Sequence, residues 1–307
     1  MTAHPTPAFL PLTGIYEPSA IQQLADGRFL VVEDEKQHPF SLVSISLDGR
    51  ISSAPLEPGF FQAYGNFWKL DDLEGLALDR AGFVYAITSH SRDGDGDAKK
   101  SRDKLVRFRV EADRVVDSRV SQGLKSALCG VHPVLAAAAD ILDVKAQGGL
   151  NIEALEISAD ARHLLIGMRS PLLDGRAIIA RVENTVDMFE ADASPRISPD
   201  LITLDLGGHG IRGMAYLASL GGHLVISGPV ARETVQFRVW YWSGQPGDAA
   251  RRVDVPGLAG FEHAEGLCPA VIDGQPRIVM VSDDGSRAAE RPARYLLLDP
   301  GQLRIAP

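Results

Sequence analysis

Charged residues recur at one position of a repeated sequence pattern. Glu74, Glu153, Arg212 and Glu265 each precede a Gly or Ala and an apolar run, and Ser19 holds this position in a fifth segment. We call these five the anchor residues. If equivalent positions meet at the centre of a fold, three carboxylates repel one another there unless a cation, a proton or the guanidinium compensates them.

Two interpretations of the anchor residues remain open. With the amide of Asn151, the carboxylates of Glu74, Glu153 and Glu265 offer the hard oxygen ligands that Ca²⁺ prefers. Alternatively, the carboxylates pair with Arg212 and form a structural ion-pair plug. Three Glu against one Arg leave an excess of negative charge, which favours a bound divalent metal, with Ca²⁺ as the first choice.

Other polar residues stand where the second apolar run of a segment ends. Glu33, Asp283 and Asp284 occupy such positions, and we predict that they bind a polar ligand together with Arg212. The alternative is that these strands end in solvated turns.

Two histidines and an arginine are the candidates for catalysis. His90 and Arg169 each end an otherwise apolar run, and His263 lies two residues before Glu265. A histidine can move a proton near neutral pH, and an arginine can bind developing negative charge. The structural alternative is that each side chain hydrogen-bonds a loop.

The segment 91–103 contains Asp93, Asp95 and Asp97 at alternate positions, as at the start of a calcium loop. The position of the bidentate glutamate holds Lys104, and further basic residues lie nearby. A solvated loop is therefore favoured over a weak calcium site or a rim that closes over substrate. The sequence has no G-x-S-x-G elbow, H-E-x-x-H helix, Walker loop or dinucleotide-binding glycine motif.

The elements that must position these residues are short strands. The anchor residues are 53 to 79 residues apart, and each segment contains apolar runs of four to six residues bounded by turn signals such as Asp26-Gly27. Such spacing predicts an all-β fold, a single β-propeller domain over 1–307 with five blades, or six if the longest interval contains a degenerate blade. The Ala-rich stretch predicts a helical insertion near 131–147, and residues 8–16 are expected to complete the last blade, so that both termini close the ring.

Composition narrows the class of protein. The 307 residues are 45% hydrophobic and 23% charged, with a net charge of −9 and a pI of about 5.4. An acidic chain repels phosphate backbones, so no nucleic-acid partner is expected. Because neither a secretory signal nor a membrane-spanning run is evident, we expect a cytoplasmic protein with no membrane partner. The isolated Cys129 and Cys268 are expected to be thiols, and the oligomeric state is not predicted.

The segments DLEGLALD (72–79), NIEALEIS (151–158), GIRGMAYL (210–217) and HAEGLCPA (263–270) resemble those of a bacterial propeller family classed as a domain of unknown function. That family is similar to esterase-like phytase propellers and, more remotely, to calcium-dependent gluconolactonase and senescence-marker propellers. The resemblance covers about Ser19 to Asp299 and implies an axial site at Glu74, Glu153, Arg212 and Glu265. It implies no substrate, and the basic cluster that a phytase needs is absent.

Two functions from different classes follow. The first is a metal-dependent hydrolase of a small ester, lactone or phosphoester, acting at the propeller axis. The alternative is a non-catalytic propeller that binds a peptide or protein on one rim, with the central charges as a plug. In that case, the aromatic residues of 66–70 and 239–244 are candidate contacts.

Overall fold

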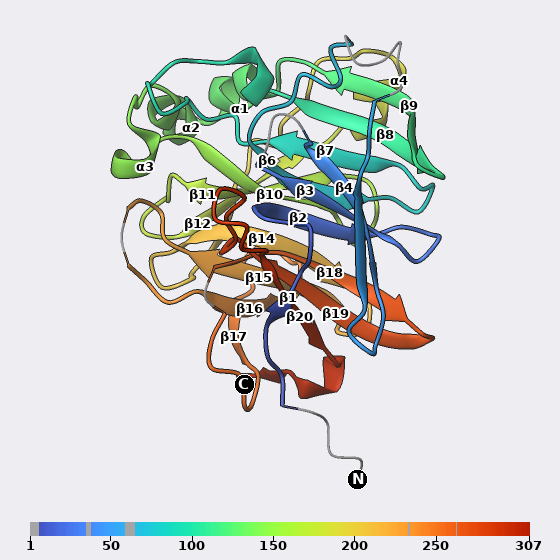
Figure 1. Ribbon diagram of the computed structural model, residues 1–307. Helices are drawn as coiled ribbons and strands as arrows, with labels where there is room; N and C mark the ends of the chain where they lie inside the picture. The colour runs from blue at the N-terminus through green and yellow to red at the C-terminus, as the bar shows by residue number, and fades with distance from the viewer. Residues whose placement is uncertain (1–5, 35–37, 59–64, 233, 262) are drawn as a thin grey trace.

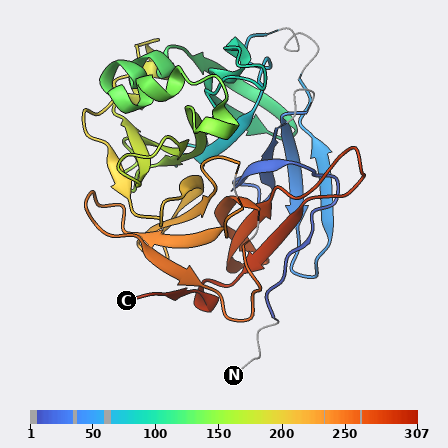
Figure 2. The ribbon, with the colours of Figure 1, turned by 90° about the vertical axis from the view of Figure 1, so that its left-hand side faces the viewer.

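Runs of β-branched and aliphatic residues form twenty-one strands in the computed structural model, which describes residues 6–34, 38–58, 65–232, 234–261 and 263–307. All of them belong to five antiparallel sheets arranged around one axis (Figures 1 and 2). The fold is thus the predicted five-bladed β-propeller with a few short helices.

Each blade is a meander whose first strand lies nearest the axis. Blade 1 consists of β2 (Pro18–Gln23), β3 (Phe29–Glu33), β4 (Phe40–Ile45) and β5 (Ile51–Pro55). Blade 2 consists of β6 (Leu73–Leu78), β7 (Val84–Thr88), β8 (Leu105–Glu111) and β9 (Arg114–Ser121). Blade 3 consists of β10 (Asn151–Ile157), β11 (Leu164–Ser170), β12 (Ala177–Val182) and β13 (Ile202–Leu204).

The last two blades contain both chain ends. Blade 4 consists of β14 (Gly210–Leu217), β15 (Gly222–Gly228), β16 (Arg238–Trp242), β17 (Arg251–Asp254) and the C-terminal β21 (Arg304–Ile305). Blade 5 consists of β18 (Ala264–Ile272), β19 (Gln275–Ser282), β20 (Arg294–Leu298) and the N-terminal β1 (Leu10–Pro11). The pairing of Leu10 with Tyr295 confirms the predicted closure, whereas the addition of β21 to blade 4 was not expected.

The helical insertion is longer than predicted and broken into three pieces. Helices α1 (Leu124–Val131), α2 (Pro133–Ala139) and α3 (Val144–Gln147) connect blades 2 and 3. Pro133 has no N–H to continue α1 and instead begins α2. Gly148, with φ of +68°, ends α3 in the left-handed conformation that favours glycine. A further helix, α4 (Thr185–Glu190), follows β12, and 3₁₀ turns lie at Lys100–Arg102 and Pro300–Gln302.

Hydrophobic clusters fill the interfaces between neighbouring blades. Between blades 1 and 2, the rings of Phe40 and Phe108 lie 5.0 Å apart, and Phe67 and Trp68 pack against Phe40. Between blades 3 and 4, Trp242 is fully buried. The aromatic residues considered as partner contacts therefore contribute mainly to the core.

Candidate functional site

Each anchor residue is the extra residue of a β-bulge. The pairing of every innermost strand with its neighbour skips one residue, and the skipped residues are Ser19, Glu74, Glu153, Arg212 and Glu265. A bulge re-aims the side chain of the extra residue out of the regular alternation. All five anchor residues line one cavity at the axis, so the sequence repeat corresponds to a repeated local geometry.

The small residue after each anchor lets neighbouring strands approach at the axis. A Cβ atom on Gly75 would lie 2.8 Å from the backbone nitrogen of Leu155, and one on Gly266 would lie 2.7 Å from Cα of Ala20. One on Gly213 would overlap the carbonyl oxygen of Glu265. Larger residues at these positions would push the blades apart.

The cavity is a pocket of about 290 Å³ at the end of the axis where the innermost strands begin. Below the anchor residues the axis holds a space of only about 10 Å³, at most enough for one water molecule. Between the described residues, the axis is therefore nearly closed on this side of the pocket.

The pocket wall is densely charged. The carboxylates among its described residues are Glu17, Asp34, Asp72, Glu74, Asp93, Asp143, Glu153, Glu265 and Asp283. The cations are Arg92, Arg102, Lys145, Arg169, Arg212 and Arg232. Carboxylates therefore outnumber cations in the pocket as a whole, as they do among the anchor residues.

Glu153 is fixed by several donors. Arg212 Nη1 lies 2.8 Å from Glu153 Oε2, Arg169 Nη1 lies 3.0 Å from Oε1, and Asn151 Nδ2 donates to Oε1 at 3.0 Å. Arg212 also pairs through Nη2 with Glu265. Arg169 is itself a bulge residue of β11, which explains why its side chain turns toward Glu153. This part of the site matches the ion-pair interpretation of the anchor residues.

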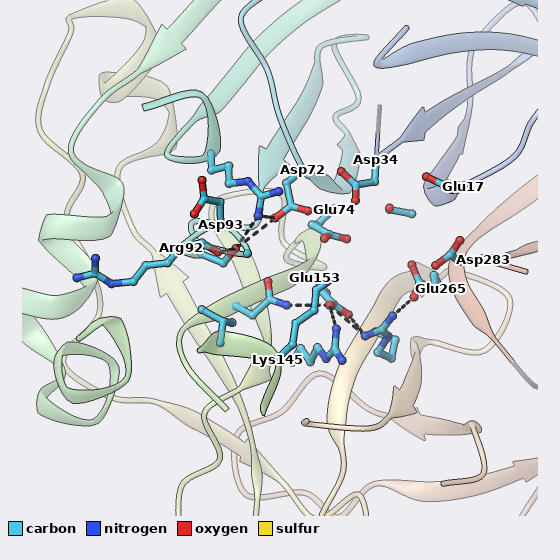
Figure 3. Close-up of a pocket in the computed structure, with 18 of the residues that line it drawn as sticks. Glu17, Asp34, Asp72, Glu74, Arg92, Asp93, Lys145, Glu153, Glu265 and Asp283 are labelled. Atoms are coloured by element: carbon cyan, nitrogen blue, oxygen red, sulfur yellow. Dashed lines mark hydrogen bonds and ion pairs between the residues drawn. The ribbon is translucent and has the colours of Figure 1, made fainter. Parts of the chain in front are cut away.

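Glu74 differs from the other two anchor carboxylates. No hydrogen bond or ion pair joins its carboxyl group to another residue in the described part of the chain, and Figure 3 shows it across the pocket from Glu153. Burial and the carboxylates of Glu153, Asp72 and Asp34 raise the pKa of Glu74 well above its ordinary value. Glu74 thus holds a proton more readily than an ordinary glutamate does.

Asp34 and Asp283 line the pocket beside Glu74. The side chain of Asp34 faces the open space of the cavity, yet the surrounding protein and the carboxylate of Asp72 raise its pKa to about 7. Burial also raises the pKa of Asp283, against the attraction of Arg212. Asp72 differs because Arg102 Nη1 lies 2.9 Å from its Oδ2.

The helical insertion contributes to the pocket. Asp143, Val144 and Lys145 line it from α3, and the N–H of Arg232 donates to the carbonyl oxygen of Lys145 at 2.8 Å. This bond joins α3 to the loop between β15 and β16 at the mouth. The side chains of Lys145 and Arg232 are exposed, and neither has an ion-pair partner within the described ranges.

Seven of the predicted site residues line the pocket: Glu74, Asn151, Glu153, Arg169, Arg212, Glu265 and Asp283. Glu33 and Asp284 do not. Glu33 is buried behind the pocket and accepts hydrogen bonds from Tyr16 N and Ser41 Oγ, and Asp284 pairs with Arg294. Neighbouring residues at a strand end point to opposite sides, so Asp34 and Asp283 face the axis while Glu33 and Asp284 face away.

His90 and His263 also lie outside the pocket, which corrects their prediction as catalytic residues there. The His90 side chain is fully buried, with Nδ1 2.8 Å from the carbonyl oxygen of Thr88 and Nε2 3.3 Å from Asp103 Oδ1. Burial lowers the pKa of His90. His263 is exposed and packs against the ring of Phe237. Both histidines have positive φ, so their backbone conformation turns the chain at these positions.

The predicted calcium ligands all line the pocket, but some of them already have partners in the protein. Arg212 pairs with both Glu153 and Glu265, so Glu74 and the Oδ1 atom of Asn151 are the groups of that set left without a donor. Across the described residues, no group of three His, Cys, Asp or Glu side chains is arranged to hold a metal ion. Calcium binding stays a prediction, and it requires Arg212 to release at least one carboxylate.

The aspartate-rich loop is ordered by its own contacts. Asp93 Oδ1 accepts the N–H groups of Asp95 and Asp97, and Asp93 Oδ2 lies 3.1 Å from Lys99 Nζ. The carboxylate of Asp93, which would be the first ligand of a calcium loop, therefore already has partners in the protein.

The predicted site leaves out several pocket residues, among them Asp34, Asp72, Lys145 and Arg232. Asp72 carries a usable signal because it lies two residues before an anchor residue, as His263 does. Lys145 and Arg232 carry none, since only the packing of α3 against the β15–β16 loop brings them to the mouth.

Comparisons with solved structures find propellers of distant similarity. A protein described as a glucose dehydrogenase from Thermus thermophilus is 15% identical, covering 95% of this chain and 100% of that one, with a TM-score of 0.49. The PQQ-bound aldose sugar dehydrogenase from Streptomyces coelicolor is 13% identical, covering 98% and 100%, with a TM-score of 0.44. A family AA12 carbohydrate-active enzyme from Trichoderma reesei is 11% identical, covering 97% and 88%, with a TM-score of 0.43. At these values the similarity concerns chain architecture only.

Two searches gave negative results. No curated protein matches this chain significantly. Among the described residues, no helix has the length and apolar character that a membrane span needs.

The family of the chain follows from a match to a family model. That model, described as a protein of unknown function (DUF3616), matches residues 138–299. This match covers more than half of the sequence, and the chain therefore belongs to the DUF3616 family.

Proposed function

We propose that the axial pocket is the active site of a hydrolase that acts on a small ester, lactone or phosphoester, with Glu74 as the group that moves the proton. The observation that carries the proposal is the contrast between two anchor carboxylates. Glu153 is held by Arg169, Arg212 and Asn151, whereas Glu74 has no partner within the described structure. Paired carboxyl groups in unlike environments are typical of acid–base sites.

For an ester or lactone, the chemistry of hydrolysis assigns one role to Glu74 and another to Arg169. Ionised Glu74 accepts a proton from a water molecule, whose oxygen bonds to the substrate carbonyl carbon. The carbonyl electron pair moves to its oxygen, where the guanidinium of Arg169 stabilises the negative charge. The tetrahedral intermediate then expels the alkoxide, which takes the proton from Glu74, so water and ester give acid and alcohol.

Arg169 suits this role because its geometry is fixed in advance. Its Nε donates to the carbonyl oxygen of Pro229 at 3.0 Å, and its Nη1 donates to Glu153. About 14% of its side chain is exposed, on a residue that lines the pocket. A donor held in place before the reaction stabilises developing charge without reorganisation.

The divalent cation predicted from the sequence gives a second version of this proposal. Asn151 and Glu74 would supply two of its ligands, and Glu153 or Glu265 would join them only after leaving Arg212. When bound, such a cation would polarise the carbonyl or phosphoryl oxygen. Arg212 pairs with Glu153 and Glu265, and these contacts compete with metal binding. No step of the reaction above therefore depends on a metal.

The test is hydrolysis of chromogenic esters, lactones and phosphoesters by the purified protein and by Glu74→Gln. We expect kcat/KM to fall by about 100-fold or more in the variant, as for loss of a general base. Glu111→Gln is the matched control, since Glu111 is exposed at the end of β8. Because only ionised Glu74 accepts a proton and burial raises its pKa, kcat/KM should increase with pH. Equal activity of Glu74→Gln and the unmodified protein would refute the role of Glu74.

The second candidate function is the non-catalytic propeller that binds a peptide or protein on one rim. The bridge from Arg212 to both Glu153 and Glu265 favours it, since such a bridge also serves as a structural plug. If no ester, lactone or phosphoester is hydrolysed while removal of Arg212 destabilises the fold, this second candidate is the better one.

A further inference from the structure

The charges of the axial pocket are unevenly distributed around the ring. Residues from blades 1, 2 and 5 supply seven carboxylates and two guanidinium groups. Residues from blades 3 and 4, together with α3, supply four cations and two carboxylates. Figure 3 shows this separation, with Asp34, Asp72 and Glu74 on one side and Glu153 and Lys145 on the other. The pocket therefore has an acidic wall and a basic wall.

Two carboxyl groups of the acidic wall have no donor of their own. Arg102 is held by Asp71, Asp72 and Ser91, which leaves Glu74 and the cavity-facing Asp34 without a cation. A separate observation on the facing strand β10 also indicates a missing donor: Oδ1 of Asn151, a pocket residue only 6% exposed, has no hydrogen-bond partner. Buried acceptors without donors are rare in proteins and indicate a missing partner. A ligand group that donates several hydrogen bonds and carries positive charge satisfies them.

The basic wall has the opposite property. Lys145 and Arg232 are joined through their backbones, and their exposed side chains have no described ion-pair partner. An anionic or electron-rich oxygen of a ligand satisfies these donors.

From these two walls we infer that the pocket takes a substrate with an ammonium group beside the hydrolysed bond, namely an amino-acid ester or amino lactone, and releases a zwitterionic amino acid. This inference rests on the proposed hydrolase function. The ammonium group lies against Asp34, which leaves Glu74 to accept the proton of water, and the ester carbonyl oxygen lies against Arg169. After hydrolysis the new carboxylate is held by the basic wall, near Lys145.

The test uses three lactones that differ only next to the carbonyl: α-amino-γ-butyrolactone, its N-acetyl derivative and γ-butyrolactone. At a pH where the amine is protonated, we expect kcat/KM for the amino lactone to exceed both others by at least about 10-fold, as for a desolvated charge pair. Asp34→Asn should reduce this ratio at least fivefold, whereas Glu111→Gln should preserve it. Equal hydrolysis of the three lactones would overturn the inference and leave the hydrolase function standing.

Calorimetry separates binding from catalysis. The product homoserine and the matched 4-hydroxybutyrate are titrated into the unmodified protein and into Lys145→Gln. We expect homoserine to bind at least about 10-fold more tightly than 4-hydroxybutyrate and to lose affinity in Lys145→Gln. If homoserine binds in this way but none of the lactones, chromogenic esters and phosphoesters is hydrolysed, the ligand class stands and the hydrolase function fails. If neither compound binds and none of these substrates reacts, both proposals are refuted.

Discussion

Strand β10 places one buried glutamate at each end of the propeller axis. The two glutamates differ in the groups that surround them. Glu153, at the pocket end, is surrounded by guanidinium groups and an amide. Glu156, three residues on, lies at the opposite end and accepts the N–H groups of Ile157 at 2.6 Å and Tyr216 at 2.7 Å. Burial raises the pKa of Glu156 to about 7.

This difference shows what each end of the axis does. Tyr216 belongs to β14, so Glu156 links blade 3 to blade 4 through backbone groups alone. Such contacts satisfy the carboxyl group and leave little for a ligand to bind. At the pocket end, charge is concentrated beyond what the fold needs, and Glu74 remains unpartnered in the described structure. Buried charge that the fold does not use is the better indicator of function.

The largest expected effect comes from removing the cation at the pocket end. Arg212→Met leaves Glu153 and Glu265 buried with reduced compensation, and we expect the free energy of unfolding to fall by about 3–5 kcal/mol. Thermal or urea unfolding measures this loss. Adding Glu153→Gln and Glu265→Gln to Arg212→Met should restore part of it. The exposed pair of Arg252 and Asp254 provides the control, since Arg252→Met should change stability by less than about 1 kcal/mol. An unchanged stability of Arg212→Met would show that the bridge is dispensable.

A smaller effect concerns pH at the opposite end. Because the folded-state pKa of Glu156 lies above its ordinary value of 4.5, folding favours the protonated carboxyl group. Its contribution is present at low pH and is lost as pH rises through about 7, by on the order of 3 kcal/mol. We expect Tm to decrease between about pH 5 and pH 8. Asp34, Glu74 and Asp283 act in the same direction, because their pKa values are also raised.

Substitution at position 156 isolates its share of this pH dependence. Glu156→Gln should flatten the dependence of Tm on pH, whereas Glu111→Gln should leave it unchanged. A dependence that is identical in Glu156→Gln would mean that Glu156 is ionised throughout this range.

The smallest expected effect sharpens the question of metal binding. Since Arg212 neutralises two of the predicted ligands, calcium must displace this cation to bind, and we expect EDTA and CaCl₂ to change Tm only slightly. Elemental analysis of the purified protein accompanies the melting curves. One bound metal per chain, lost together with a decrease in Tm, would support the calcium site predicted from the sequence.

The central part of the site was accessible from sequence because it repeats. The anchor residues share a spacing and a following Gly or Ala, and the same bulge turns each of them to the axis. The choice between Glu33 and Asp34 was not accessible, since it depends on strand register at a single residue.

The remaining pocket residues depend on tertiary contacts. Lys145 and Arg232 reach the mouth only through the packing of an insertion against a loop, which has no periodic signal. The role of residues 8–16 could be predicted because the last blade lacked its outer strand. The position of β21 could not be predicted, because blade 4 already had four strands without it.

The pairing of β1 with β20 has a consequence for the order of events during synthesis. Leu10 leaves the ribosome 285 residues before its partner Tyr295. The ring cannot close until Tyr295 has been synthesised, and contacts between segments so distant in sequence form slowly. Because the pocket takes side chains from every blade, it becomes complete only when this late pairing has formed, so a partly synthesised chain has no complete site.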